Sequence, residues 1–153
     1  MIRIGLDTNV LAYLAGVERA SADGTKVAAA RDLTRRIDGR ADLVAPVQVW
    51  GELFTVLTRA GATRAEARTM ITDFRSTIET VGVDVTTFEE ALDLAEVHRL
   101  QMWDAIIVRA CASAGCGLLL SEDMQTGFKV GSMTIANPFA TSLDSRLQAL
   151  LSS

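Results

Sequence analysis

The sequence has few of the residues on which several classes of protein depend. Its apolar runs, such as those at 44–47 and 118–120, are far shorter than the roughly 20 residues of a membrane-spanning helix. The amino-terminal segment contains Arg3 and resembles a strand, not a signal peptide. These absences lead us to expect a cytoplasmic protein.

Cysteine and histidine are too scarce for a zinc site or for histidine-based acid–base chemistry. Cys111 and Cys116 lie close together in an apolar stretch rich in Ala and Gly, and no further Cys or His offers the partners that zinc needs. We expect both to be reduced thiols that pack in the core. His98 lacks the second histidine of a metal-free acid–base ribonuclease, and we interpret it as structural or solvated.

The charge is mildly acidic and gives no clear indication of a ligand. The 19 acidic residues outnumber the 15 basic ones, for a net charge of -4, and a negative field opposes binding to nucleic acid. If four carboxylates hold cations, 19 minus 4 leaves 15 acids against 15 bases. Lysine occurs only at Lys26 and Lys129, so the bases are nearly all arginines, whose guanidinium groups suit phosphates. A local basic patch is therefore compatible with the composition.

Strand-like and helix-like segments alternate along the whole chain. We predict strands at 2–6, 43–45, 81–85, 118–120 and 133–136, helices at 10–14, 26–37, 46–57, 63–79, 87–98, 102–114 and 143–151, and loops at 17–24 and 121–131. Thr63 and Thr87 each precede a Glu by three residues and are interpreted as capping boxes. No repeat or linker appears, so residues 1–153 are expected to form one α/β domain, a parallel sheet covered by helices on both faces.

Two acids follow predicted strands, at the edge of the sheet where ligands bind in open parallel sheets. Asp7 ends the first strand, and Asp123 comes just after the strand at 118–120. Each also has a purely structural explanation as a helix cap or turn former. The sequence pattern alone leaves both explanations open.

Two further acids lie on predicted helices. Asp104 begins an apolar stripe, because the residues three, four and seven positions further on are Ile107, Val108 and Cys111. An acid on such a stripe is costly unless it is paired or coordinates an ion, although a first-turn acid is also favoured by the helix dipole. Glu52 lies at the border of its helix's apolar face, where a solvated side chain is ordinary. Together, four acids from four elements offer hard oxygen ligands for Mg²⁺ or Mn²⁺.

Five segments resemble, in order, the motifs of the PIN domain family. Ile4–Leu11 is similar to its opening motif, a strand that ends in Asp followed by Ser or Thr and then Asn. Val49–Leu53 resembles the helix with the second acid, Trp103–Ile107 the third motif, and Leu119–Met124 the fourth, in which Ser or Thr precedes Asp by two residues. Asn137–Phe139 matches the usual finish of VapC-type members. The resemblance covers nearly the whole chain.

This resemblance implies a three-layer α/β sandwich with a mostly parallel five-stranded sheet, a homodimer, and an endoribonuclease that depends on Mg²⁺ or Mn²⁺. It carries over four catalytic and metal-binding carboxylates, namely Asp7, Glu52, Asp104 and Asp123. It carries over three supporting polar residues that orient the acids or metal-bound water, namely Thr8, Asn9 and Ser121. VapC-type members are toxins, so an RNA substrate and an antitoxin protein are the implied partners. Glu122 is left out, because an adjacent acid on extended backbone can point the other way.

Other functions remain to be weighed. A haloacid-dehalogenase-like phosphatase needs a second Asp two residues after the first, where this chain has Asn9. A receiver domain needs an acid pair near its first strand and a phosphorylatable Asp after a later one. A PIN-like module that binds protein or RNA without cutting it is the main alternative, and the presence of all four acids argues against it. The chain alone does not separate a toxin from a free-standing PIN nuclease.

Overall fold

A six-stranded sheet runs through the middle of the structure, a computed structural model that describes residues 1–153. In chain order its strands are β1 (Ile2–Leu6), β2 (Ala41–Pro46), β3 (Glu79–Val81), β4 (Leu118–Leu120), β5 (Lys129–Val130) and β6 (Met133–Ala136). Their order across the sheet is β3-β2-β1-β4-β6-β5, and every neighbouring pair is parallel except β5 with β6. The predicted α/β fold with a mostly parallel sheet is confirmed.

Two of the strand predictions are wrong in detail. The sheet has six strands and not five, because the segment 121–131, expected to be a loop, contains the two-residue strand β5. So short a strand shows no alternation of apolar residues by which to recognise it. The third strand is Glu79–Val81 and not 81–85, because Val85 already belongs to the next helix.

Seven helices connect and cover the strands. They are α1 (Thr8–Leu14), α2 (Asp23–Ile37), α3 (Val47–Arg59), α4 (Arg64–Arg75), α5 (Val85–His98), α6 (Met102–Ser113) and α7 (Ser145–Ser152). Thr63 caps α4 as expected, since its hydroxyl accepts from the Glu66 amide at 3.1 Å. That helix ends at Arg75, however, and not near residue 79. The capping box expected at Thr87 is also wrong, because Asp84 caps α5 by accepting from the Thr87 amide at 2.7 Å.

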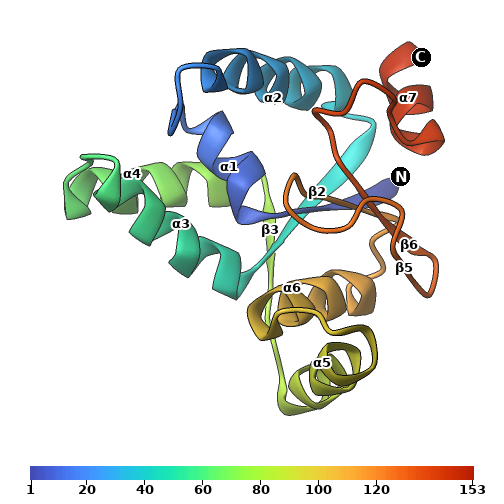
Figure 1. Ribbon diagram of the computed structural model, residues 1–153. Helices are drawn as coiled ribbons and strands as arrows, with labels where there is room; N and C mark the ends of the chain where they lie inside the picture. The colour runs from blue at the N-terminus through green and yellow to red at the C-terminus, as the bar shows by residue number, and fades with distance from the viewer.

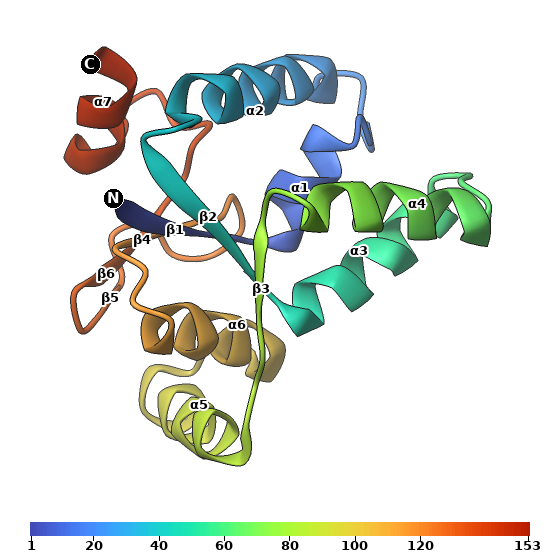
Figure 2. The same cartoon turned by 180° about the vertical axis from the view of Figure 1, so that it is seen from behind.

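The helices form a layer on each side of the sheet. Helices α5 and α6 lie on one side, and α1, α2 and α7 lie on the other, while α3 and α4 extend from the edge near β3 (Figures 1 and 2). All three residues of β4 are fully buried between the layers. Cys111 and Cys116 are buried free thiols, as expected. None of the helices is both long and apolar enough to cross a membrane.

The strand order creates a crevice between β1 and β4. From β1 the chain adds β2 and β3 on one side, whereas β4 and β6 lie on the other side. Neighbouring parallel strands whose connections diverge in this way leave an opening at their carboxyl ends, where α/β proteins bind ligands. Asp7, which follows β1, therefore lies at the opening, and Ser121, which follows β4, is buried behind it.

Candidate active site

Asp7 joins the ends of β1 and β4. Its backbone amide donates to the Leu120 carbonyl oxygen at 3.0 Å, which continues the pairing of the two strands. Its side chain is the N-cap of α1, where Oδ1 accepts from the Thr8 amide at 2.7 Å. The other carboxylate oxygen accepts from the Ser121 hydroxyl at 2.7 Å. These contacts fix a carboxylate that is only 6% exposed.

Burial makes the charged form of Asp7 costly. Desolvation is the largest cause, and it raises the pKa of Asp7 from 3.8 to about 6. The hydrogen bonds from Ser121 and Thr8 act in the opposite direction, and the negative charges of Asp104 and Glu52 raise the pKa further. The polar contacts therefore only partly compensate for a buried charge among like charges.

Glu52 approaches Asp7 from the second turn of α3. Its Oε2 accepts from the Thr8 hydroxyl at 2.5 Å, and its Oε1 accepts from the Gln48 side-chain amide at 3.0 Å. Thr8 therefore contacts two of the acids, one through its backbone and one through its hydroxyl. This small network connects the amino end of α1 to α3.

Asp104 lies in the first turn of α6 and is half-buried. Ile107, Val108 and Cys111 are buried, so the apolar stripe expected from the sequence is present, with this acid at its start. Desolvation is the first cause that raises the pKa of Asp104, and the charges of Glu52 and Asp123 add to it. The three acids come from different elements and line the same pocket.

Asp123 is exposed, in the loop that follows β4. The Asn9 side-chain amide donates a hydrogen bond to its Oδ2. The loop is anchored two residues earlier, where the fully buried Ser121 hydroxyl accepts from the Met124 amide at 3.2 Å. Ser121 thus contacts both Asp7 and the backbone of the loop that carries Asp123.

The four acids line one open pocket of about 460 Å³ at the carboxyl ends of the strands. Its other lining residues are Thr8, Asn9, Arg19, Thr55, Val56, Arg59, Gln101 and Trp103. In Figure 1 the first turns of α1, α3 and α6 all lie toward the left of the strands. The first turn of α1 follows Asp7, that of α3 precedes Glu52, and that of α6 carries Asp104. The structure therefore brings together the four acids with Thr8 and Asn9, while Ser121 lies behind Asp7 and outside the lining.

The donor chemistry of this pocket suits a hard divalent cation, because every charged acceptor is a carboxylate oxygen. No three acidic, Cys or His side chains are yet arranged as ligands of one ion. Two of the acids are turned to polar neighbours, since Glu52 accepts from Thr8 and Asp123 accepts from Asn9. An ion would have to compete with those hydrogen bonds for the carboxylate oxygens.

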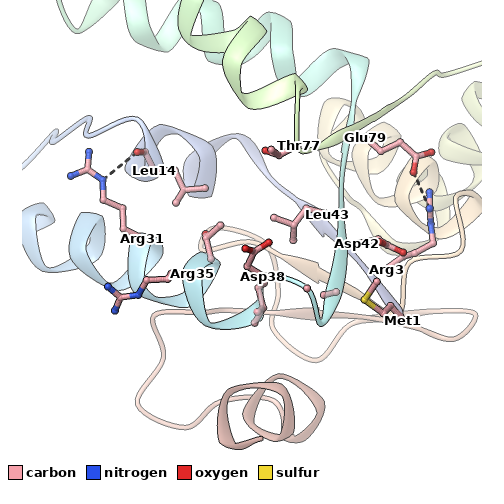
Figure 3. A pocket seen from close by; sticks show the side chains of 14 residues that line it. Met1, Arg3, Leu14, Arg31, Arg35, Asp38, Asp42, Leu43, Thr77 and Glu79 are labelled. Carbon is pink, nitrogen blue, oxygen red and sulfur yellow. Dashed lines mark hydrogen bonds and ion pairs between the residues drawn. The ribbon is translucent and has the colours of Figure 1, made fainter.

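A larger pocket, of about 900 Å³, lies at the opposite edge of the sheet, where the strands begin (Figure 3). Opposite charges mix along its wall, and Arg3 donates to Glu79 at 2.9 Å. None of the four acids lines this pocket. We therefore place the candidate chemistry at the smaller pocket.

The structure also places Glu122 and His98, the two residues that the sequence analysis left out of the site. Glu122 does not line the acidic pocket, because its carboxylate accepts from the Tyr13 hydroxyl and pairs with Lys26, both at 2.9 Å. His98 is exposed, and its ring meets that of Phe128 edge to face at 5.0 Å between centroids. Both residues lie outside the candidate site.

Sequence reasoning missed Arg19, Arg59 and Trp103, which line the pocket beside the acids. A signal was available for one of them. Arg59 lies seven residues after Glu52 on α3, and that spacing places two side chains on one helix face. Arg19 lies between α1 and α2, where the sequence has no periodicity to orient a side chain.

Comparison with known proteins agrees with this architecture. A sequence model of the PIN domain family matches residues 4–129. Comparison with curated protein sequences gives no match. These two results rest on sequence alone.

Solved structures of toxin–antitoxin proteins are similar in fold. VapC20 of Mycobacterium tuberculosis, a sarcin-ricin loop cleaving toxin, aligns with a TM-score of 0.57 at 19% identity, over 76% of this chain and 86% of that one. VapBC2 of Rickettsia felis, bound to a promoter DNA fragment, gives 0.61 at 12% identity, over 80% and 89%. A toxin–antitoxin complex from Klebsiella pneumoniae gives 0.61 at 16%, over 89% and 98%. With a family match over most of its length and this shared fold, the chain belongs to the PIN domain family.

Proposed function

We propose that this protein is a metal-dependent endoribonuclease, the toxin of a toxin–antitoxin pair, and that residues 1–153 form its single PIN domain. The observation that carries the proposal is the convergence of Asp7, Glu52, Asp104 and Asp123, from four separate elements, on one open pocket. Membership of the PIN domain family and the fold shared with VapC20, a toxin that cleaves the sarcin-ricin loop, support it.

The acids are the metal-binding and catalytic residues of this proposal, with Mg²⁺ or Mn²⁺ as the ion. When bound, such an ion activates water and offsets the charge that builds on the phosphoryl oxygens during phosphodiester hydrolysis. The raised pKa values of Asp7 and Asp104 support the assignment, because a cation would relieve the repulsion and desolvation that raise them.

The polar neighbours of the acids have a positioning role. Thr8 and Asn9 donate to Glu52 and Asp123, and these bonds limit the rotation of both carboxylates before an ion binds. Ser121 donates to Oδ2 of Asp7 and limits the rotation of this carboxylate in the same way. These neighbours therefore hold the carboxylates beside the pocket, and an ion would replace some of these hydrogen bonds when it binds.

The partners follow from the same proposal. One of the similar structures is a toxin–antitoxin complex, from Klebsiella pneumoniae, and we propose that this protein also binds a cognate antitoxin. A homodimer and action in the cytoplasm, where RNA and the antitoxin meet, complete the proposal. An antitoxin would inhibit by covering the acidic pocket or by neutralising it with a basic side chain.

The test is an RNA cleavage assay with purified protein freed of antitoxin. We expect cleavage with Mg²⁺ or Mn²⁺, none in excess chelator, and none with Asp123→Asn. Glu122→Gln is the matched control, because this acid is adjacent in sequence but turns to Tyr13 and Lys26. Cleavage that persists in chelator would refute the metal mechanism. Tight RNA binding without cleavage under any metal would favour a PIN-like binding module.

A further inference from the structure

Trp103 is a large apolar side chain that the fold leaves in solvent. It is 59% exposed, whereas Trp50, the other tryptophan, is 5% exposed. Trp103 precedes Asp104 on α6 and lines the acidic pocket. The aromatic pairs and cation–π contacts of the structure all involve other rings. The indole faces are therefore free for a ligand.

The position of Trp103 is nevertheless fixed at its backbone. The Gln48 side-chain amide donates to the Trp103 carbonyl oxygen at 3.4 Å and to Glu52 at 3.0 Å. One side chain thus connects the backbone next to the exposed ring with an acid in the pocket. The packing of the protein does not explain why this ring is exposed. An exposed aromatic ring that is held beside charged groups is placed to contact a ligand.

Two arginines line the same pocket as Trp103. Arg19 and Arg59 are exposed, and neither guanidinium makes a hydrogen bond or an ion pair within the protein. In a protein with a net charge of -4, unpaired cations beside an acidic pocket favour an anionic ligand that extends beyond the acids. Guanidinium groups suit phosphate oxygens in particular.

We infer that Trp103 is a substrate-binding residue that stacks on an unpaired base next to the phosphate being cut, while Arg59 and Arg19 contact flanking phosphates. The inference rests on the proposed ribonuclease function and adds a determinant of specificity to it. Bases within a double helix have both faces covered by their neighbours, so only an unpaired nucleotide can offer a face to the indole. The enzyme then requires a nucleotide that is unstacked beside the cut, and tolerates any base there.

A nucleotide ligand explains the exposed indole, the two unpaired arginines and the acidic pocket together better than a protein partner does. A peptide that inserts a basic side chain among the acids could cover the exposed indole, but it would leave Arg19 and Arg59 without an anionic partner. A nucleotide strand offers an aromatic face to Trp103 and phosphates to the arginines, and an ion held by the acids would attract it.

The binding test uses intrinsic fluorescence and a short RNA strand that is 2′-O-methylated throughout, with Mg²⁺ present and electrophoresis to verify that the strand stays intact. We expect the strand to quench the wild type and its duplex to quench much less. The quench should disappear in Trp103→Phe, because the remaining Trp50 is buried. A quench that persists unchanged in this variant, or that is as strong with the duplex, would overturn the inference.

The kinetic test compares Trp103→Ala and Trp103→Phe with Phe88→Ala, which removes a 42% exposed ring on α5 that does not line the pocket. We expect Trp103→Ala to lower kcat/KM about five- to hundredfold, mainly through KM, with little change in melting temperature. Trp103→Phe should restore part of the loss, and Phe88→Ala should behave as wild type.

The outcomes separate this inference from the proposed function. If the wild type cuts RNA and Trp103→Ala cuts it with unchanged KM, the inference is wrong and the nuclease assignment stands. If no RNA is cut but the single strand alone quenches Trp103, the nuclease assignment is wrong and the binding role stands. Normal cleavage by Trp103→Ala together with weaker inhibition by an antitoxin would assign the ring to the protein partner and overturn the inference.

Discussion

Replacing Asp7 with Asn should stabilise the metal-free protein at neutral pH and not at acidic pH. Folding raises the pKa of this carboxyl from 3.8 to about 6, mainly through burial. The folded state therefore binds more protons than the unfolded state between those two values. Its stability decreases as the pH rises through this window, because an increasing share of the buried groups must be charged.

The size of the effect follows from the same two values. At about 1.36 kcal/mol per pKa unit, the interval from 3.8 to about 6 corresponds to about 3 kcal/mol at pH 8. Asn keeps the cap of α1, because its oxygen can accept from the Thr8 amide. Compared with protonated Asp, Asn also loses the hydrogen bond from Ser121, and the loss of this neutral bond costs about 1 kcal/mol. The net gain is about 2 kcal/mol at pH 8, and at pH 4 the variant is slightly less stable than the wild type.

The assay is urea unfolding of both proteins in chelator across pH 4 to pH 8. The contributions of other titrating groups largely cancel in the difference between the two proteins, so the pH dependence of that difference belongs to Asp7. In thermal unfolding, a gain of 2 kcal/mol corresponds to roughly 4–8 °C for a domain of this size. A difference that does not change with pH, or a variant that is destabilised at pH 8, would refute the reasoning. Adding Mg²⁺ should reduce the difference in the free energy of unfolding between the variant and the wild type, because the ion stabilises only the intact site.

Three further changes test the site and the core. Asp104→Asn should abolish RNA cleavage and raise the melting temperature in chelator, because it removes a carboxylate whose pKa is raised first by desolvation and then by the charges of Glu52 and Asp123. Near-normal cleavage would remove this residue from the site. Ser121→Ala should lower the free energy of unfolding by about 1–3 kcal/mol, since it removes a buried partner of Asp7, and should raise the pKa of that acid above about 6 in an NMR titration. Gly5→Ala should lower the free energy of unfolding by about 1–3 kcal/mol, because the added Cβ would lie 2.6 Å from Sγ of the buried Cys111 on α6. Its matched control in urea unfolding is Gly51→Ala, where nothing lies within 4 Å and the helix should gain about 0.5–1 kcal/mol.

The sequence predicted the elements whose signals are local. The strand at 133–136 has the expected bounds, and Thr63 caps α4 as expected. The errors occur where two local signals compete. Thr87 and Glu90 have the spacing of a capping box, but Asp84 lies three residues earlier and caps the helix first. The extra turn of helix that results includes Val85, which the prediction had placed in a strand.

The lining of the acidic pocket could be predicted from the sequence only in part. Asp7 and Asp123 were expected at one edge because the carboxyl ends of parallel strands share an edge. Which other side chains reach that edge depends on how far each helix projects past the sheet, and sequence periodicity gives the face of a helix but not its axial position. Arg59 was foreseeable as a neighbour of Glu52 on the face of α3, whereas its place in the same pocket lining as Asp123 depends on the tertiary structure.

The structural explanation of Asp7 does not exclude the functional one. Its carboxylate caps α1 and also lines the pocket, and the same is true in part of Asp104, a first-turn acid that opens on the same space. A helix amino end presents unpaired amides and a partial positive charge, so a carboxylate placed there is favoured locally even without an ion. That local stabilisation offsets part of the cost of gathering like charges. A variant that removes both the cap and the charge could lose cleavage for either reason, so its loss of activity does not separate the capping role of Asp7 from its metal-binding role. Asp7→Asn separates them, because it keeps the cap and removes only the charge.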